Sequence, residues 1–316
     1  MQRCRILFAL SFLLQGLILS SCSIRTDPKS TEGQWTRQKS GTRANLSSVI
    51  FVNDRKGWVV GEKGTILHSE DGGQTWAPQE SKTEADLFSV DFINEQVGWA
   101  AGSQRVFLHT RDGGRTWSMQ SEKGEKTILD IDFITPDEGW SVGTFQDVLK
   151  TSTGGSQWEA QSTESTFNWT SVFFLDPLVG WATSMRGDII YTLDGGKTWT
   201  GQIRIIHPLA TVHFVDTSYG WAGGSDGRVL ATTDGGQHWV QQTSGTTENL
   251  WGLVFVDQKV GWAVGEGGLV LHTTDGGHRW RQSDSGTHEN LWNVTFSNAS
   301  RGWAVGHGGT ILRYVR

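Results

Sequence analysis

A Gly-Trp dipeptide recurs through the chain at a nearly fixed interval, and this repeat limits the possible folds more than any other feature. Successive tryptophans of the series stand 41, 41, 41, 40, 41 and 41 residues apart. They are Trp58, Trp99, Trp140, Trp181, Trp221, Trp262 and Trp303. A second motif, Ser/Thr-x-Asp-Gly-Gly-x-x-Trp, runs in step with the first and ends at Trp76, Trp117, Trp158, Trp199, Trp239 and Trp280. Two registered series of this length indicate one structural unit copied along the chain.

Each unit reads as four short strands. In the sixth copy an apolar run at residues 250–256 precedes the Gly-Trp strand at 261–265, a third strand at 269–273 and a last strand that begins near Trp280. Turns rich in glycine separate these runs, and the whole chain holds 41 glycines. Short β-branched and aromatic runs between such turns are typical of hairpins, and helical periodicity is absent from the sequence. Four strands in about forty residues predict one blade of a β-propeller.

The two ends of the sequence complement each other. The last unit stops after its third strand, at residues 310–316, and has no Asp-Gly-Gly turn. The missing fourth strand matches residues 34–40, in which Trp35 takes the place of Trp76. We therefore predict an all-β fold over residues 34–316: a seven-bladed β-propeller with four antiparallel strands per blade. Its last blade would be closed by the N-terminal strand, which removes open sheet edges.

The residues before the repeats have a different composition. A basic start at residues 1–5 leads into an apolar run at 6–18, and small residues stand directly before Cys22. This order is typical of a secretory signal, and the run is too short for a stable membrane span. Small residues ahead of a cysteine resemble the lipobox of bacterial lipoproteins. We expect a lipoprotein signal peptide at 1–21 and a tether at 22–33 lipidated on Cys22; the alternatives are an ordinary signal peptide or an uncleaved anchor.

The net charge and the number of cysteines exclude several classes of partner and bond. Removal of residues 1–21 takes away Arg3, Arg5 and Cys4, so the 27 basic residues become 25 against 33 acidic ones, a formal charge of −8. We do not expect non-specific binding to nucleic acid or to anionic lipid headgroups. Cys22 would be the only cysteine left, so an internal disulfide is not expected. The sequence has no metal-ligand spacing, and we predict neither a metal nor a cofactor.

The second motif resembles the Asp-box of the BNR repeat, which also occurs in sialidases and in carbohydrate-active propellers. Its aspartates are expected to be structural, because each can accept hydrogen bonds from backbone N–H groups of its own turn. These aspartates are Asp71, Asp112, Asp194, Asp234 and Asp275. The second glycine of each box can take a positive φ. Thr153 replaces the aspartate of the third box, so we expect that turn to be held less well.

The full repeat pattern is more specific to one protein family than the Asp-box alone. Gly-Trp strands and Asp-boxes repeated to seven blades behind a lipobox resemble the photosystem II assembly and stability factor family of cyanobacteria and chloroplasts. The resemblance covers about residues 33–316. It implies a non-enzymatic lumenal or periplasmic propeller that binds nascent membrane-protein subunits during reaction-centre assembly. It also implies an arginine-rich contact patch, whereas this acidic chain offers only a loose set of basic residues.

Positions that vary at a fixed place in the repeat are candidates for recognition, since loops on a rigid scaffold carry function. In up-and-down blades, the turns between second and third strands share one rim with the inter-blade connections, and the Asp-boxes lie on the other rim. Three arginines fall in the second, fourth and fifth blades. They form either a binding patch on one side of the ring or a set of unrelated, solvated side chains. Three aromatic residues occupy the same position in the first strands of their blades. They either pack in the inner end of the blade or form a surface that binds a peptide or a sugar. These candidates are Arg105, Arg186, Arg228, Phe88, Trp251 and Trp292.

Catalysis is not expected. A sialidase-like mechanism needs an arginine cluster, a tyrosine nucleophile beside a carboxylate, and an acid/base carboxyl group. Tyr191, Tyr219 and Tyr314 are the only tyrosines, and none occupies a first-strand position facing the channel. We therefore predict no catalytic residue.

Two functions remain. The first is a membrane-tethered assembly or stability factor that binds membrane-protein subunits or their peptide segments, of photosystem II type if the organism is photosynthetic. The second is a periplasmic carbohydrate-binding propeller in which Trp251 and Trp292 stack on sugars. The resemblance favours the first. In both cases we expect an exported monomer, lipid-anchored on the periplasmic side of a membrane or in a cyanobacterial thylakoid lumen.

Overall fold

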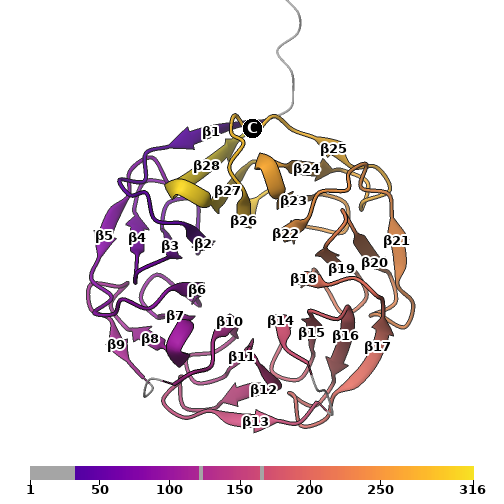
Figure 1. Cartoon of the computed structure of the whole chain (residues 1–316), viewed down its shortest axis with the longest axis horizontal. Coiled ribbons are helices and arrows are strands. Elements are labelled where there is room, and N and C mark those ends of the chain that lie inside the picture. The colour runs from indigo at the N-terminus through magenta and orange to yellow at the C-terminus, as the bar shows by residue number, and fades with distance from the viewer. Residues whose placement is uncertain (1–32, 121–123, 164–166) are drawn as a thin grey trace, which may run out of the picture. The chain divides into compact units, whose positions relative to one another are not determined.

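The computed structural model describes residues 33–120, 124–163 and 167–316, which fold as seven four-stranded antiparallel sheets. Figure 1 shows these sheets arranged around a common axis, with the chain passing once round the ring. The predicted seven-bladed all-β propeller is confirmed. The predicted signal peptide, lipidated Cys22 and tether lie outside the described residues. Within the described ranges, the helices are all too short or too polar to cross a membrane.

Each blade contributes one strand to each of four concentric layers. The innermost strands are β2 (Leu46–Phe51), β6 (Leu87–Phe92), β10 (Ile128–Phe133), β14 (Trp169–Phe174), β18 (Leu209–Phe214), β22 (Leu250–Phe255) and β26 (Leu291–Asn298). The second strands are β3 (Gly57–Gly61), β7 (Gly98–Gly102), β11 (Gly139–Gly143), β15 (Gly180–Ser184), β19 (Gly220–Gly224), β23 (Gly261–Gly265) and β27 (Arg301–Gly306).

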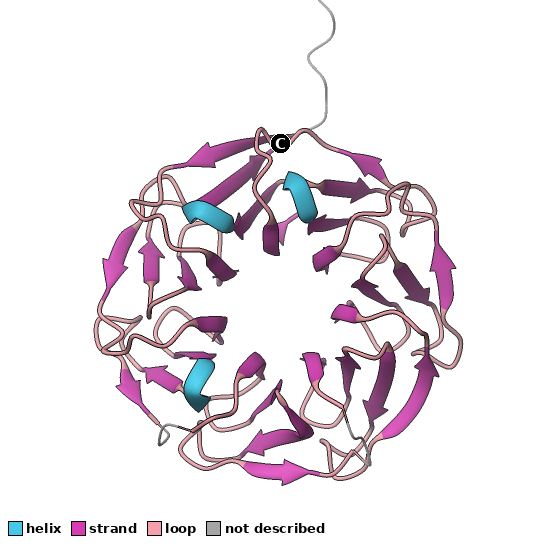
Figure 2. Ribbon diagram, viewed as in Figure 1, coloured by secondary structure: helices cyan, strands magenta, loops and turns pink. Residues whose placement is uncertain are grey.

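Of the two outer layers, the third is mostly buried, whereas the outermost strands are short and mostly exposed. The third strands are β4 (Ile66–Ser69), β8 (Phe107–Thr110), β12 (Phe145–Thr151), β16 (Asp188–Thr192), β20 (Val229–Thr232), β24 (Val270–Thr273) and β28 (Thr310–Val315). The outermost strands are β5 (Ala77–Gln79), β9 (Ser118–Met119), β13 (Glu159–Gln161), β17 (Thr200–Arg204), β21 (Val240–Gln242), β25 (Arg281–Gln282) and β1 (Gln34–Gln38). Three short 3-10 helices, drawn in cyan in Figure 2, are η1 (Ser103–Arg105), η2 (Glu266–Gly268) and η3 (His307–Gly309).

The Gly-Trp dipeptide forms the seam between neighbouring blades. Trp58 is fully buried and stacks on Phe92, the last residue of the next blade's first strand, with ring centroids 3.6 Å apart. Its indole N–H donates to the carbonyl of Gly113 in the next Asp-box, at 3.1 Å. Gly57 makes room for the preceding seam, because a side chain there would lie 2.5 Å from the ring of Phe51. Burial of a whole indole at every junction supplies much of the apolar burial that stabilises the ring.

The N-terminal strand completes the seventh blade, as predicted. β1 pairs with β28 in antiparallel register, from Gln34 opposite Val315 to Gln38 opposite Ile311. Trp35 meets Phe296 edge-on at 5.8 Å and 87°. Trp76 meets Phe51 with the same separation and angle in the first blade. Trp35 therefore does replace the tryptophan of a missing Asp-box.

The Asp-box turns are held by their own side chains, also as predicted. Asp194 accepts hydrogen bonds from the backbone N–H and hydroxyl of Thr198, at 2.9 and 2.6 Å. Both glycines of this box, Gly195 and Gly196, have positive φ. In the third box the hydroxyl of Thr153 still accepts the N–H of Gln157, at 3.0 Å. This turn thus retains the main bond of the motif but has no carboxylate for a second one.

Candidate functional site

The two rims of the propeller carry different groups. On one rim, the turn between second and third strands meets the following inter-blade connection, where the Lys63 N–H donates to Asp86 at 2.9 Å. On the other rim, the Asp-box meets the turn between first and second strands, where the Gly72 N–H donates to the carbonyl of Arg55 at 2.8 Å. We call the first the connection rim and the second the box rim. The arrangement agrees with the one expected from the sequence.

A cavity of about 430 Å³ opens on the connection rim, at the mouth of the central channel. The second residue of every innermost strand, one from each blade, lines this cavity. These residues are Ser47, Phe88, Leu129, Thr170, Ala210, Trp251 and Trp292. The three aromatic residues singled out in the sequence therefore line one cavity, and all three are partly buried there.

Trp251 and Trp292 form a pair across the junction of the sixth and seventh blades. Their ring centroids are 4.2 Å apart, at an interplanar angle of 30°. Gly252 permits this approach, because a side chain at that position would lie 3.0 Å from the Cα of Asn293. Trp292 also contacts the ring of His307, at 5.1 Å. The pair presents an aromatic wall to the cavity.

Carboxylates line other parts of the same wall. Glu62 accepts the side-chain N–H of Asn45 at 2.7 Å, and Asp86 accepts the Lys63 backbone N–H. Asp130 accepts the hydroxyls of Ser89 and Ser171, at 2.9 and 3.0 Å. Within the described part of the chain, none of these three carboxylates forms an ion pair. The cavity is therefore acidic as well as aromatic.

Below the mouth, side chains of one innermost strand bond to the backbone of the next. The Asp130 carboxylate accepts the Val172 N–H at 3.1 Å, and Asn293 accepts the Val49 N–H at the same distance. Deeper in the channel, the Asp91 carboxylate accepts the Phe133 N–H at 2.7 Å. These bonds connect the innermost strands, whose edges face the channel rather than another strand. Sequence reasoning missed them because the residue type that forms such a bond changes around the ring, from serine to aspartate and asparagine.

The channel carboxylates titrate abnormally. Burial raises the pKa of Asp130 to about 6, although the Val172 N–H and the two serine hydroxyls oppose the shift. Burial also raises the pKa of Asp91, and it raises that of Asp132 with a further contribution from the nearby Asp91 charge. On the innermost strand β18 of the fifth blade, burial lowers the pKa of His213 to about 4. The low-dielectric channel disfavours the charged form of both kinds of group.

The three candidate arginines do not converge. Arg105 ends η1 and is exposed, and its backbone N–H donates to the Lys126 carbonyl. The Arg186 guanidinium lies 3.9 Å above the ring of Phe167 on the fourth blade. The Arg228 guanidinium donates to Gln241 of the outermost strand β21, at 2.7 Å. None of the three lines the cavity at the channel mouth.

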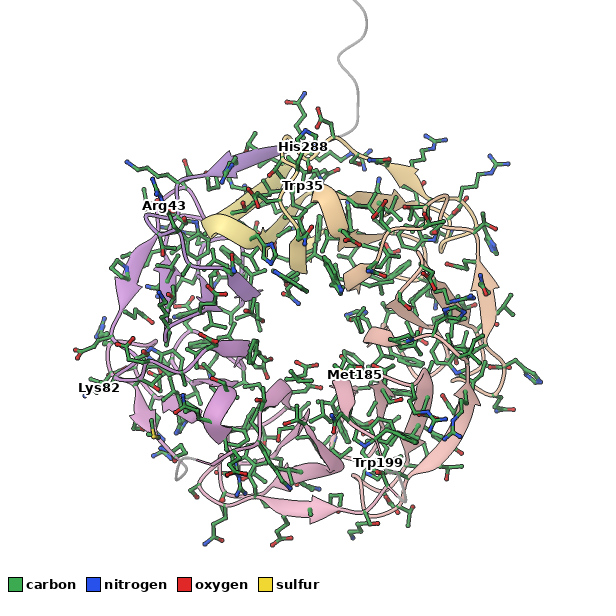
Figure 3. All side chains as sticks on the ribbon, viewed as in Figure 1. Trp35, Arg43, Lys82, Met185, Trp199 and His288 are labelled. Atoms are coloured by element: carbon green, nitrogen blue, oxygen red, sulfur yellow. The ribbon has the colours of Figure 1, made fainter. Side chains whose placement is uncertain are left out.

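The fourth blade exposes apolar side chains beside Arg186. Met185 is 51 % exposed and Ile206 is 92 % exposed. The turn and the connection that carry them are joined at Gly187, whose carbonyl accepts the Ile205 N–H at 3.0 Å. Figure 3 places Met185 nearer the central opening than Trp199 of the same blade. This apolar surface therefore lies on the connection rim with the cavity.

In the part of the chain that the structure describes, none of the three tyrosines lies on an innermost strand. Tyr191 lies on β16 and Tyr314 on β28, in the third layer, and Tyr219 directly precedes β19. The described residues contain no group of three or more His, Cys, Asp or Glu side chains placed to hold a metal ion. His68, which recurs as histidine in two other blades, stacks on Trp58 at 4.9 Å. It is part of a blade seam.

Known proteins share this fold and part of its sequence. The family described as photosynthesis system II assembly factor YCF48 matches residues 27–124, 117–209, 201–284 and 249–315. A solved structure described as YCF48 bound to D1 peptide has a TM-score of 0.77 at 22 % identity, covering 89 % of this chain and 97 % of that one. YCF48 from Cyanidioschyzon merolae has a TM-score of 0.75 at 23 % identity, covering 89 % and 98 %.

More distant propellers share the fold alone. The WD40 propeller domain of Doa1 has a TM-score of 0.74 at 13 % identity, covering 90 % of this chain and 96 % of that one. No curated protein sequence matches the chain. The family match, by contrast, runs through all seven blades. The chain belongs to the family of the photosynthesis system II assembly factor YCF48.

Proposed function

We propose that this protein is a non-enzymatic assembly factor that binds a peptide segment of a membrane-protein subunit, of photosystem II type in a photosynthetic organism. The observation that carries the proposal is the family match over the whole propeller. A solved relative described as YCF48 bound to D1 peptide supports the same class of ligand. A rigid ring that presents variable side chains on one rim suits the capture of an extended segment.

The connection rim is the surface that we assign to the partner. It carries the aromatic and acidic cavity, and the exposed side chains of Met185 and Ile206 lie on the same rim. Exposed apolar side chains beside a concave site are typical of protein-binding surfaces. The box rim, in contrast, is built from repeated turns that differ little from blade to blade.

We further propose that the protein is exported and anchored by a lipid on Cys22, on the periplasmic side of a membrane or in a thylakoid lumen. The basic start, the short apolar run and the small residues before Cys22 support this. Replacing Cys22 with alanine should release the protein from the membrane fraction, whereas Cys4→Ala should leave it bound. Membrane association that survives Cys22→Ala would contradict the anchor.

Cross-linking in native membranes tests the partner. The tagged protein is cross-linked, the membranes are solubilised, and mass spectrometry identifies the captured subunits. Reaction-centre subunits are expected with the unmodified protein and should be lost with Ile206→Asp. A matched control is Leu193→Asp, because Leu193 is also exposed on the fourth blade but lies in its Asp-box on the box rim. Equal capture by both variants would show that the connection rim is not the binding surface. If no integral-membrane subunit is captured by the unmodified protein, the proposed assembly function is wrong.

The Trp251–Trp292 pair favours one second candidate, a carbohydrate-binding propeller. Adjacent indoles that line a cavity are a common platform for sugar rings, and these two lie 4.2 Å apart. This function predicts retention on a polysaccharide column that is lost in Trp292→Ala. Retention without any protein partner would place this candidate first.

A further inference from the structure

We propose that the cavity at the channel mouth receives a cationic side chain, lysine or arginine, from the bound peptide segment. This inference rests on the proposed peptide-binding function and specifies its chemistry. It depends on three features of the described residues: an aromatic wall, a set of carboxylates without ion-pair partners, and a cavity sized for a side chain.

The aromatic wall offers the face of a π-system. Trp251 and Trp292 stand side by side at 4.2 Å, and both line the cavity. An ammonium or guanidinium group over an indole face is attracted by the negative face of the π-system, and arginine can also stack in parallel. Phe88 and Leu129 line the same cavity and could contact the aliphatic stem of the entering side chain.

The carboxylates supply the opposite charge. Glu62, Asp86 and Asp130 line the cavity and are oriented by neutral donors: an amide side chain, a backbone N–H and two serine hydroxyls. Such donors fix the position of a carboxylate without cancelling its charge. Among the residues that line the cavity, His307 is the only one that could carry a positive charge. A cation from outside would therefore meet uncompensated negative charge.

The size and position of the cavity also fit. About 430 Å³ lies at the small end of the range of about 300–1,000 Å³ for ligand sites, which suits one long side chain better than a folded element. The mouth opens on the connection rim, where the exposed Met185 and Ile206 could contact the flanking residues of the segment. One basic residue with apolar neighbours is thus the segment that this rim fits.

A pair of isosteric peptides tests the charge. We would use a short Gly-Ser peptide with one central arginine and the same peptide with citrulline, which has nearly the same shape but no charge. Binding to the full-length protein is followed by ligand-observed NMR at low and high salt. The arginine peptide should bind about tenfold more tightly than the citrulline peptide, and the difference should shrink as salt rises.

Two variants locate the effect. The double variant Glu62→Gln, Asp86→Asn removes two charges from the cavity and should reduce the preference for arginine about tenfold. Glu159→Gln is the matched control, because Glu159 lies exposed on the outermost strand β13. Both variants keep Asp130, so the bonds below the mouth remain intact. Their melting temperatures check that each variant is folded.

The outcomes separate this inference from the proposed function. Equal binding of the two peptides, or an unchanged preference in the double variant, would overturn the cationic site. Binding of a neutral oligosaccharide but not of the arginine peptide would overturn it as well. If native membranes still yield reaction-centre subunits in that case, the assembly function stands without the cationic site. If they yield none while the arginine preference holds, the site stands and the function falls.

Discussion

The box rim and the channel use the same side chain with opposite electrostatic results. On the box rim, the hydroxyl and N–H of Thr198 lower the pKa of the partly exposed Asp194 to about 2. In the channel, Asp130 also accepts backbone and hydroxyl donors, but burial raises its pKa to about 6. Hydrogen bonds stabilise the carboxylate in both places, so desolvation decides the sign.

The comparison separates positions that repeat from positions that vary. Each box aspartate bonds within its own turn, so a copied sequence reproduces it in almost every blade. A channel side chain bonds instead to the backbone of the next blade, and different residues serve: Ser48, Ser89, Asp130 and Asn293. Variation at these positions leaves the ring intact and changes the chemistry of the channel.

Matched tryptophan substitutions should give the largest difference. Trp58→Ala removes a fully buried indole from a seam and should lower the free energy of unfolding by about 3–5 kcal/mol. Trp292→Ala removes a partly exposed indole from the channel mouth and should cost much less stability, while it weakens ligand binding. Urea denaturation measures both variants. A similar loss of stability in the two variants would mean that Trp292 belongs to the core rather than to the variable channel mouth.

The channel carboxylates should make stability depend on pH. Because their pKa values are raised, the folded protein holds protons that the unfolded chain releases above about pH 4. Their stabilising contribution is therefore fully present below about pH 4 and is lost as pH rises through the folded values, about 6 for Asp130. Asp91→Asn imitates the protonated form, so this variant should gain about 2 kcal/mol relative to the unmodified protein between pH 4 and pH 8.

The pH dependence of the free energy of unfolding must be measured for both Asp91→Asn and the unmodified protein, because other groups in the chain also titrate. Burial lowers the pKa values of His68, His109 and His213, and these groups change stability in the opposite direction over an overlapping range. Denaturation curves of both proteins at a series of pH values isolate the carboxylate contribution. A constant difference between Asp91→Asn and the unmodified protein across this range would show that water solvates the channel fully.

Removal of a box carboxylate should have a moderate effect. Asp112→Ala loses bonds from the Thr116 N–H and hydroxyl, at 2.9 and 2.7 Å, and should cost about 1–2 kcal/mol. The pKa of Asp112 is lowered, so its contribution is present above about pH 4 and is lost in more acid solution. Thermal unfolding at pH 7 and pH 3 measures it. A cost that is larger at pH 3 would contradict the assignment.

Restoration of the missing box carboxylate should give a small gain. Thr153→Asp adds charge to the bond with the Gln157 N–H and should stabilise the third blade by about 0.5–1 kcal/mol. The double variant Thr153→Asp, Gln157→Thr also supplies the hydroxyl that the other boxes use, and should be the more stable of the two. No gain in either variant would mean that the threonine already satisfies this turn.

The fold could be predicted almost completely from the sequence, because its determinants repeat. The fixed distance between Trp58 and Trp99 reflects one blade, and the match of Trp35 to Trp76 revealed how the ring closes. The aromatic residues Phe88, Trp251 and Trp292 could also be placed together, since all three occupy one position in their units.

The rest of the site could not be predicted. Asp130 is a single aspartate in a strand, and nothing near it in sequence announces a role. Its partners Ser89 and Ser171 lie 41 residues away on either side, and only the closed ring brings them to it. Arg105, Arg186 and Arg228 stood out by charge, but their positions on the ring depend on turn geometry and on neighbours such as Phe167.

Because β1 closes the ring, the last step of folding must wait until the C-terminal strand has been synthesised. The five residue pairs of this closure join the first strand of the propeller to the last, at the two ends of the described chain. The first strand of the propeller to emerge during synthesis, β1, therefore has no partner until β28 is made, whereas β28 can also pair with β27. Contacts so distant in sequence form slowly, and until then the outer edge of the seventh blade and the seam to the first blade stay open. An interrupted chain is thus an open ring, whose unpaired edge strands could add to other chains.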